Sequence, residues 1–179
     1  MKGIFLFMTI KIDWNQFKIK NENHRKSFED LCYHLFCRKF GITEGIRRNY
    51  NQVGLEIYPI NDKKTSKCIG FQSKFFDNKL SDSSSKKQII DSIKKAKKSY
   101  KDLDKIIIYT HLSFGSKNPE YKQKIEKEAG KIEIEWFIKS NFEILLNQPL
   151  NLDLTQLYFD IGDELGFIKK ERKGSGLNI

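Results

Sequence analysis

The sequence predicts an α/β fold in which a central mixed β-sheet is flanked by helices on both faces. One observation is the continuous apolar run "KIIIYT" at 105–110, which is typical of a strand buried on both faces. Another is the order of the periodic segments along the chain: helix, two or three strands, helix, strand, helix, strand, helix. Such an alternation indicates a sheet covered on both sides.

Three helices are predicted to flank the sheet. The first spans about 21–40, where apolar residues recur at spacings of three and four: Phe28, Leu31, Cys32, Leu35, Phe36 and Phe40. Gly41 follows, at the position of a left-handed C-cap. The second helix, 86–101, follows a serine-rich loop, and its apolar residues face inward while its lysines face outward. The third, 119–129, starts with Pro near its first position.

The strands are predicted from alternating or continuous apolar residues. A short strand is expected at 46–49, and alternating strands at 53–60 and 68–76. Because the turn between the last two is short and polar, we expect them to form an antiparallel hairpin. The buried strand at 105–110 comes next, and a further alternating strand spans 132–137. A short helix at 142–146 follows.

The chain is expected to contain one main domain, 21–150, between two smaller pieces. Residues 1–20 form an N-terminal extension, whose apolar start is too short for a signal peptide and lacks a cleavage site; Met8 is an alternative start. Residues 151–179 hold an amphipathic helix interrupted by Gly162 and a basic tail or linker. No segment approaches the length of a transmembrane helix, so no membrane partner is expected.

The composition indicates a folded, basic protein. Hydrophobic residues make up 39% of the 179 residues, which excludes a disordered chain. The 33 basic and 23 acidic residues give a net charge of +10, which favours a polyanionic partner, with nucleic acid first and a membrane surface second. The three cysteines lack metal-ligand spacing, and two of them lie in apolar patterns. Buried thiols and a reducing, cytoplasmic compartment are therefore expected.

Three polar residues of the predicted hairpin suggest chemistry. Glu56 lies on the strand 53–60, and Gln72 and Lys74 lie on one face of the strand that follows. If the hairpin pairs them in register, a carboxylate, an amide oxygen and an ammonium group converge. Oxygen ligands of this kind suit Mg²⁺. A lysine beside the metal can orient a water molecule or offset charge that develops on a phosphate.

These residues resemble the PD-(D/E)XK nuclease superfamily, and most of all its Mrr-type restriction-endonuclease branch. The segment "GLEIYPI" supplies Glu56, "GFQSKFF" supplies the Q-x-K pair Gln72 and Lys74, and "FEDL" supplies Glu29 of the opening helix. The helix and buried strand that come next also match, so the resemblance covers about 21–146. There are two departures: Asn51-Gln52-Val53-Gly54 replaces the usual Asp-Gly pair, and Gln72 is neutral.

The resemblance implies a metal-dependent endonuclease that hydrolyses DNA and leaves a 5′-phosphate and a 3′-hydroxyl. Mg²⁺, with Mn²⁺ as a substitute, would be held by Glu56, Gln72 and Glu29, and Lys74 would position the attacking water and stabilise the pentavalent phosphate. A homo-oligomer is expected, because a double-strand break needs two active sites or two nicks. The resemblance also implies an N-terminal effector domain of a larger prokaryotic restriction or antiviral defence protein, fused to or associated with an NTPase or sensor module.

Four basic residues are predicted to contact DNA: Arg47, Arg48, Lys94 and Lys98. The two arginines precede the acidic strand, and the two lysines lie on the helix 86–101. Several alternatives remain. The domain could be a catalytically inactive nucleic-acid-binding module of the same fold, or a protein-interaction domain. Glu56 could form a cross-strand ion pair with Lys74. Gln72 and Lys74 could be solvated edge-strand residues, and Glu29 a helix-dipole residue.

Overall fold

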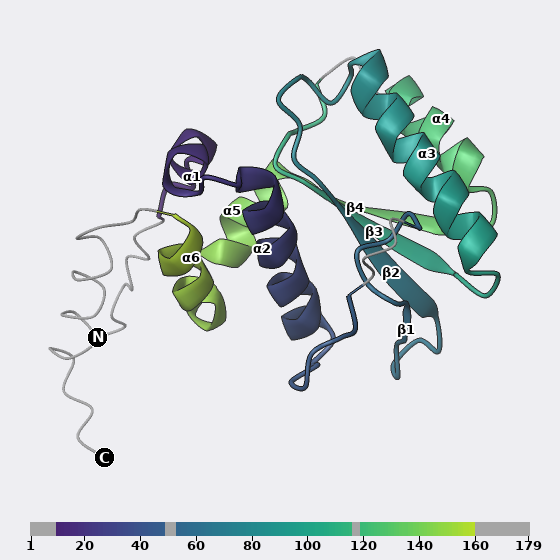
Figure 1. Ribbon diagram of the computed structural model, residues 1–179, viewed down its shortest axis with the longest axis horizontal. Coiled ribbons are helices and arrows are strands. Elements are labelled where there is room, and N and C mark those ends of the chain that lie inside the picture. Colours follow the sequence, from purple (N-terminus) through teal and green to yellow (C-terminus); the bar gives the residue numbers. More distant parts are fainter. Residues whose placement is uncertain (1–9, 49–52, 116–118, 160–179) are drawn as a thin grey trace, which may run out of the picture. The chain divides into compact units, whose positions relative to one another are not determined.

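The computed structural model describes residues 10–48, 53–115 and 119–159 (Figure 1). These residues form two compact units. The smaller unit contains the described residues before 23 and after 141, and the larger unit contains those from 23 to 141. Along the chain, the boundaries between the units fall at residues 22–23 and 141–142. The main domain predicted from the sequence spans 21–150. The first and last described segments share one unit.

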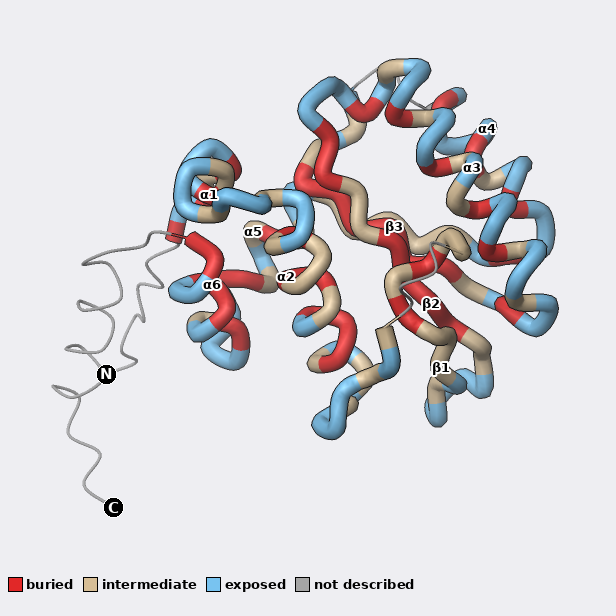
Figure 2. The backbone as a smooth tube through the Cα atoms, viewed as in Figure 1, coloured by how far each residue is buried: buried red, intermediate tan, exposed pale blue. Residues whose placement is uncertain are grey.

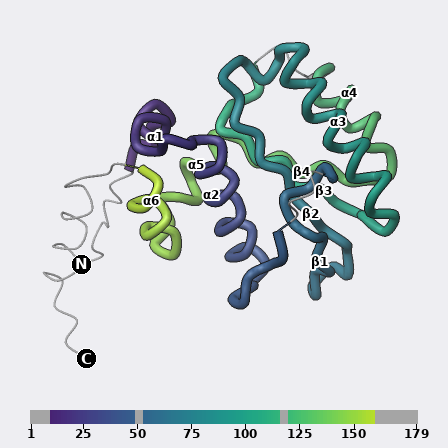
Figure 3. Tube along the Cα trace, viewed as in Figure 1, coloured from purple at the N-terminus to yellow at the C-terminus, as the bar shows by residue number. Residues whose placement is uncertain are grey.

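The larger unit contains a four-stranded mixed sheet in the order β1-β2-β3-β4, which confirms the predicted α/β class. The strands are β1 (Ile60–Asn61), β2 (Cys68–Lys74), β3 (Lys105–Thr110) and β4 (Glu133–Phe137). β1 pairs with β2 in the antiparallel sense, and β2, β3 and β4 are parallel to one another. Each parallel pair is joined through a helix, as Figure 3 traces along the chain.

Helices cover both faces of this sheet (Figure 1). Helix α2 (His24–Lys39) packs against one face, where Phe36 and Phe71 lie with their rings 5.0 Å apart. Helices α3 (Ser83–Ser99) and α4 (Pro119–Ala129) cover the other face and form one apolar cluster with β3. Burial follows these layers: β3 is buried almost throughout, whereas α3 and α4 expose their outer sides (Figure 2). All three predicted helices are confirmed.

The two faces of β2 meet different neighbours. Phe71 packs on the side of α2. Gly70 faces the opposite side, where a Cβ atom would lie 2.6 Å from Cδ1 of Leu55, a member of the α3–α4 cluster. Because side chains alternate along a strand, Gln72 and Lys74 share the side of Gly70, and Ser73 shares the side of Phe71. β2 thus sends its polar side chains to both sides of the sheet.

The predicted strand at 53–60 is wrong over most of its length. Only its last residue belongs to β1, and Ile57 forms an isolated bridge with Arg48. The backbone is held instead by Gly54, which has φ +93° and packs so closely on α3 that an added Cβ would lie 2.1 Å from the Ser92 carbonyl oxygen. A residue with this φ does not fit a regular strand, so the start of the segment departs from strand geometry. The antiparallel pairing with β2 is confirmed, but it is short.

The short strand predicted at 46–49 is also wrong in the part that the structure describes. There it is reduced to the bridge at Arg48, and its last residue lies outside the described part. Next to the bridge residue Ile57, the chain also contacts β2: the Glu56 N–H donates to the Phe71 carbonyl oxygen at 3.0 Å. This contact sets Glu56 beside the second half of β2.

The smaller unit is helical. It contains α1 (Trp14–Lys20), most of α5 (Lys139–Leu146), a 3₁₀ turn (Pro149–Asn151) and α6 (Leu152–Tyr158). α1 was not predicted, because its seven residues make only about two turns, too few to show a helical period. The Asp13 carboxylate caps it by accepting from the Asn15 and Gln16 N–H groups. The aromatic side chains Trp14, Phe17, Phe142, Tyr158 and Phe159 pack together.

Two further predictions can be compared only in part. The amphipathic helix predicted for 152–167 is confirmed as far as α6 extends, but its second half and the basic tail lie outside the described residues. Within the described residues, no helix is long and apolar enough to cross a membrane.

Candidate active site

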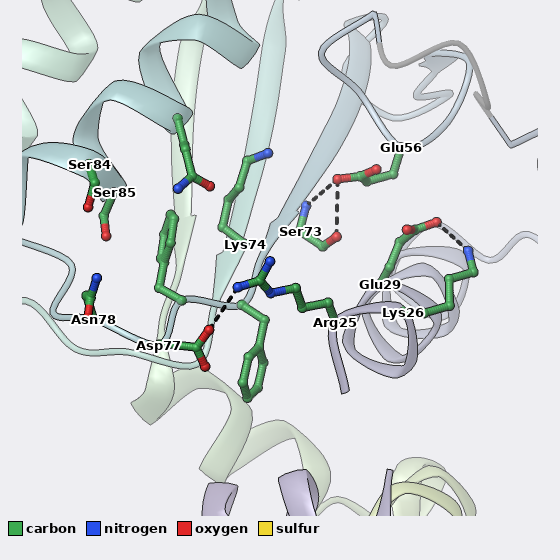
Figure 4. A pocket seen from close by; sticks show the side chains of 13 residues that line it. Arg25, Lys26, Glu29, Glu56, Ser73, Lys74, Asp77, Asn78, Ser84 and Ser85 are labelled. Carbon is green, nitrogen blue, oxygen red and sulfur yellow. Dashed lines mark hydrogen bonds and ion pairs between the residues drawn. The ribbon is translucent and has the colours of Figure 1, made fainter. Parts of the chain in front are cut away.

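A pocket of about 330 Å³ lies within the larger unit, where β2 ends. Its lining comes from α2, the segment before β1, the end of β2 with the loop that follows, and the first turns of α3. Figure 4 shows three of the four predicted catalytic residues around it: Glu29, Glu56 and Lys74. Segments distant in sequence therefore bring two carboxylates and one ammonium group to a single cavity.

Glu56 is fixed by Ser73. Its Oε1 atom accepts hydrogen bonds from the Ser73 N–H at 3.1 Å and from the Ser73 hydroxyl at 3.2 Å (Figure 4). Burial raises the pKa of the Glu56 carboxyl above its usual value of 4.5, although the positive charge of Lys74 and the Ser73 hydrogen bonds act in the opposite direction. Glu56 is thus a well-oriented carboxylate in a site that resists its charge.

Lys74 shows the complementary effect. Burial lowers the pKa of its ammonium group below the usual 10.5, while the negative charge of Glu56 opposes that shift. The positive charge of Lys95, from the facing helix α3, lowers this pKa further. Glu56 and Lys74 therefore favour each other's charged form, but desolvation outweighs that attraction in both. Such opposed shifts in one cavity are typical of functional sites.

Glu29 contributes the second carboxylate from α2. Its Oε1 atom lies 2.8 Å from Lys26 Nζ and 3.5 Å from Arg48 Nη1. Its negative charge raises the pKa of Glu56, so the two carboxylates are near enough to repel. The described residues contain no group of three or more His, Cys, Asp or Glu side chains that could hold a metal ion. Two carboxylates are nevertheless a sufficient protein contribution for Mg²⁺, which keeps several waters.

Gln72, the fourth predicted catalytic residue, is not among the residues that line the pocket in the described part of the chain. Its side chain is 0% exposed, and both polar atoms of its amide lack a hydrogen-bond partner among the described residues. A buried, unsatisfied amide is costly, so its position calls for a reason other than packing. Its predicted role as a metal ligand stays a prediction.

The four residues predicted to contact DNA do not line the pocket, as far as the structure describes it. Arg48 is bonded to Asp30 and lies over the Tyr33 ring. Arg47 lies over the ring of Tyr58, with 4.7 Å from Cζ to the ring centroid. Of the two α3 lysines, Lys94 is 3.5 Å from Glu128, and Lys98 is exposed. Arg48 already has protein partners, and the α3 lysine whose charge reaches Lys74 is Lys95.

Among the pocket residues that were not predicted, Ser73 and Arg25 form hydrogen bonds with other residues of the pocket. Ser73 was passed over because alternation turns it away from Gln72 and Lys74, yet Glu56 lies beside the strand edge and reaches it there. Arg25, in the first turn of α2, bonds to Asp77 in the loop after β2, with 2.8 Å between Nη2 and Oδ2. Its only sequence signal was a basic residue at the start of a helix.

Comparison with known proteins leaves the family open. No protein-family model matches the sequence. No curated protein matches it either.

Proposed function

We propose that this chain is a metal-dependent endonuclease with a restriction-endonuclease-like core, which hydrolyses phosphodiester bonds of DNA. One observation carries the proposal: Glu56 and Lys74 flank the end of β2 in one pocket with Glu29, and burial shifts the pKa of Glu56 up and that of Lys74 down. A fold gains no stability from such charges, whereas phosphoryl transfer uses them.

Glu56 and Glu29 would hold Mg²⁺, and the unpartnered carboxamide of Gln72 is the further oxygen donor nearby on β2. The donor set is hard oxygen throughout, which fits Mg²⁺ or Mn²⁺. When bound, the ion would lower the pKa of a coordinated water and polarise a phosphoryl oxygen. Ser73 holds Glu56 in one orientation through two hydrogen bonds, so the carboxylate needs no reorganisation.

Lys74 would act in its protonated form. Its ammonium group would orient the attacking water and offset the negative charge that grows on the phosphate. Activity should therefore decline as pH rises through the lowered pKa of Lys74, and as pH falls through the raised pKa of Glu56. The two limits of the pH profile lie closer together than those of an ordinary Glu and Lys.

The setting of this activity is part of the proposal. A double-strand break requires two active sites or two nicks, so we place the domain in a homo-oligomer. A cytoplasmic effector role in a prokaryotic restriction or antiviral defence protein, alongside an NTPase or sensor module, follows from the resemblance of the Q-x-K strand and its neighbours to Mrr-type nucleases.

The test is a cleavage assay on supercoiled plasmid with purified protein in Mg²⁺, Mn²⁺, Ca²⁺ or EDTA. We expect nicked and linear products in Mg²⁺ and Mn²⁺ and none in EDTA. Glu56→Gln should abolish cleavage, because it removes the main metal-binding charge. A parent protein that leaves the plasmid intact in every metal, but still retards it on a gel, would contradict catalysis.

That outcome would favour the second candidate, a catalytically inactive nucleic-acid-binding module. The observation behind this candidate is the net charge of +10, combined with the lack, among the described residues, of a group of three or more His, Cys, Asp or Glu side chains that could hold a metal ion. A binding module needs the charge and no metal.

A further inference from the structure

Arg25 occupies a special place in the pocket. Figure 4 shows its side chain extending from α2 over the cavity, between the end that holds Glu56 and Glu29 and the end that holds Asn78 and Ser84. The guanidinium group reaches Asp77, at 2.8 Å from Nη2 to Oδ2. It is thus an arginine within reach of whatever the pocket binds, and its partner is a single exposed carboxylate.

The other two basic residues of the pocket, as far as it is described, are committed to the proposed catalytic carboxylates. Lys26 lies 2.8 Å from Glu29, and the positive charge of Lys74 acts on the Glu56 carboxyl, whose pKa it lowers. Arg25 differs because its partner Asp77 has no part in metal binding or in the proposed chemistry. A ligand can therefore take Arg25 away from Asp77 without disturbing Glu29 or Glu56.

The exchange of Asp77 for another anion should be easy. The Arg25 side chain is 70% exposed and that of Asp77 is 48% exposed, and ion pairs this open to water contribute little to stability. Asp77 also keeps a neighbour after the exchange, since its Oδ1 lies 4.0 Å from His24 Nε2. A guanidinium group can bind a phosphate with two parallel hydrogen bonds, whereas the bond to Asp77 runs from Nη2 to Oδ2.

We propose that Arg25 binds a backbone phosphate of the DNA strand in this pocket, and that Asp77 occupies its guanidinium group when no DNA is bound. The inference rests on the proposed function for its ligand, a phosphodiester next to the scissile bond. Arg25 is a positioning residue here: it holds the strand while Lys74 and Glu56 face the reacting phosphate.

The test is a binding cycle measured by fluorescence anisotropy on a labelled DNA duplex, in EDTA so that no metal-dependent cleavage occurs. The variants are Arg25→Ala, Asp77→Asn and the double variant. Lys122→Ala and Glu126→Gln serve as matched controls, because these residues form another exposed ion pair, on α4, away from the described pocket lining. Each control makes the same change in net charge as its counterpart.

Arg25→Ala should weaken binding about tenfold at low salt and reduce the salt slope by about one, as expected for the loss of one phosphate contact. Asp77→Asn should tighten binding about threefold, because it releases Arg25. In the Arg25→Ala background, Asp77→Asn should have no more effect than Glu126→Gln. Each single variant should therefore shift affinity by more than its matched control, whereas a merely structural ion pair would shift it no more than the control does, through net charge alone.

Three results would overturn the inference: single variants that shift affinity in the same direction, an effect of Asp77→Asn that persists without Arg25, or a parent protein that does not bind DNA. Because the readout is binding, its failure can be told apart from the failure of catalysis. A parent that cleaves plasmid while the cycle fails would refute only the role of Arg25. A cycle that holds in a protein without cleavage would refute only the endonuclease.

Discussion

The two ends of strand β2 have charged groups around them, but with opposite electrostatic results. At its amino end, lysines and glutamates of neighbouring segments alternate in one network. Lys67 lies 2.6 Å from Glu133, and Lys105 lies 2.9 Å from Glu133 and 2.8 Å from Glu135. Hydrogen bonds from Lys67 and Lys105 lower the pKa of Glu133. Burial lowers the pKa of Lys105, but its bonds to the two glutamates outweigh burial and raise it.

At the carboxyl end, the charges are arranged differently. The Glu56 carboxylate accepts its hydrogen bonds from the neutral Ser73. Although the structure describes both Glu56 and Lys74, the two side chains form no ion pair. The simple cross-strand ion pair considered from the sequence is therefore absent. Burial raises the pKa of Glu56 and lowers that of Lys74.

The difference shows which charges serve the fold. The lowered pKa of Glu133 contributes stability that is present above pH 4.5 and is lost as pH falls through the folded-state pKa. Glu56 has the opposite sign: its raised pKa contributes stability below pH 4.5 that is lost as pH rises through the folded-state value. At neutral pH the amino end supports the fold, whereas the carboxyl end keeps charges at a cost in stability, as functional sites do.

The sharpest test of this contrast replaces one lysine at each end. Lys74→Met should reduce the cleavage rate by about 10²–10³, because it removes a preorganised charge from the transition state. Lys105→Met should leave the rate unchanged but lower the free energy of unfolding by about 1 kcal/mol or more, through loss of two ion pairs. Plasmid cleavage and thermal melting measure the two effects. Equal effects of both variants on the rate would remove the distinction.

Gly54 tests how the carboxyl end is built. Gly54→Ala places a Cβ atom 2.1 Å from the Ser92 carbonyl oxygen and 2.6 Å from the Ala96 nitrogen, at φ +93°. We expect a loss of about 2–4 kcal/mol in the free energy of unfolding, since neither backbone atom of α3 can yield cheaply. Urea unfolding gives the value. Gly41→Ala is the control, because Gly41 also has a positive φ but no atom within 4 Å of the added Cβ. A small, equal loss in both variants would show that the contact with α3 is not tight.

Removal of both buried charges should stabilise the protein while it destroys the activity. The double variant Glu56→Gln/Lys74→Met replaces two groups whose charged forms are disfavoured by burial. We expect a gain of about 1 kcal/mol at pH 7 over the parent, because neither neutral side chain incurs the cost of desolvation. The same pair of changes at the amino end, Glu133→Gln/Lys105→Met, should destabilise. Calorimetric melting of both double variants measures the two changes in stability. A loss of stability in Glu56→Gln/Lys74→Met, or a gain in Glu133→Gln/Lys105→Met, would contradict the prediction.

The smallest expected effect concerns Lys95. Its positive charge lowers the pKa of Lys74, so Lys95→Gln should raise that pKa and move the alkaline limit of the pH–rate profile upward. Lys98→Gln makes the same change in net charge on the same helix and is the matched control. If both variants move the alkaline limit equally, the effect is one of overall charge and not of proximity to Lys74.

Much of this architecture could be predicted from the sequence. Helices α2, α3 and α4 and strands β2, β3 and β4 were predicted close to their observed bounds. An element that buries one face has apolar residues at regular spacings, and these spacings are visible in the sequence. The order of the elements then led to the mixed sheet. The predicted hairpin brought Glu56 and Lys74 to one site, the resemblance to the nuclease superfamily added Glu29, and the three residues share one pocket. It did not predict that Gln72 would be buried outside the described pocket lining.

Other features were decided by the tertiary structure. The segment 53–60 alternates like a strand, but the close contact of Gly54 with α3 overrides that pattern. The hydrogen bonds from Ser73 to Glu56 join residues 17 positions apart, and the bond from Arg25 to Asp77 spans 52 positions. Periodicity records only which face of an element is buried. Which polar side chains meet, and whether burial or an ion pair governs their charge, depends on packing between elements, and the sequence carries no local signal for it.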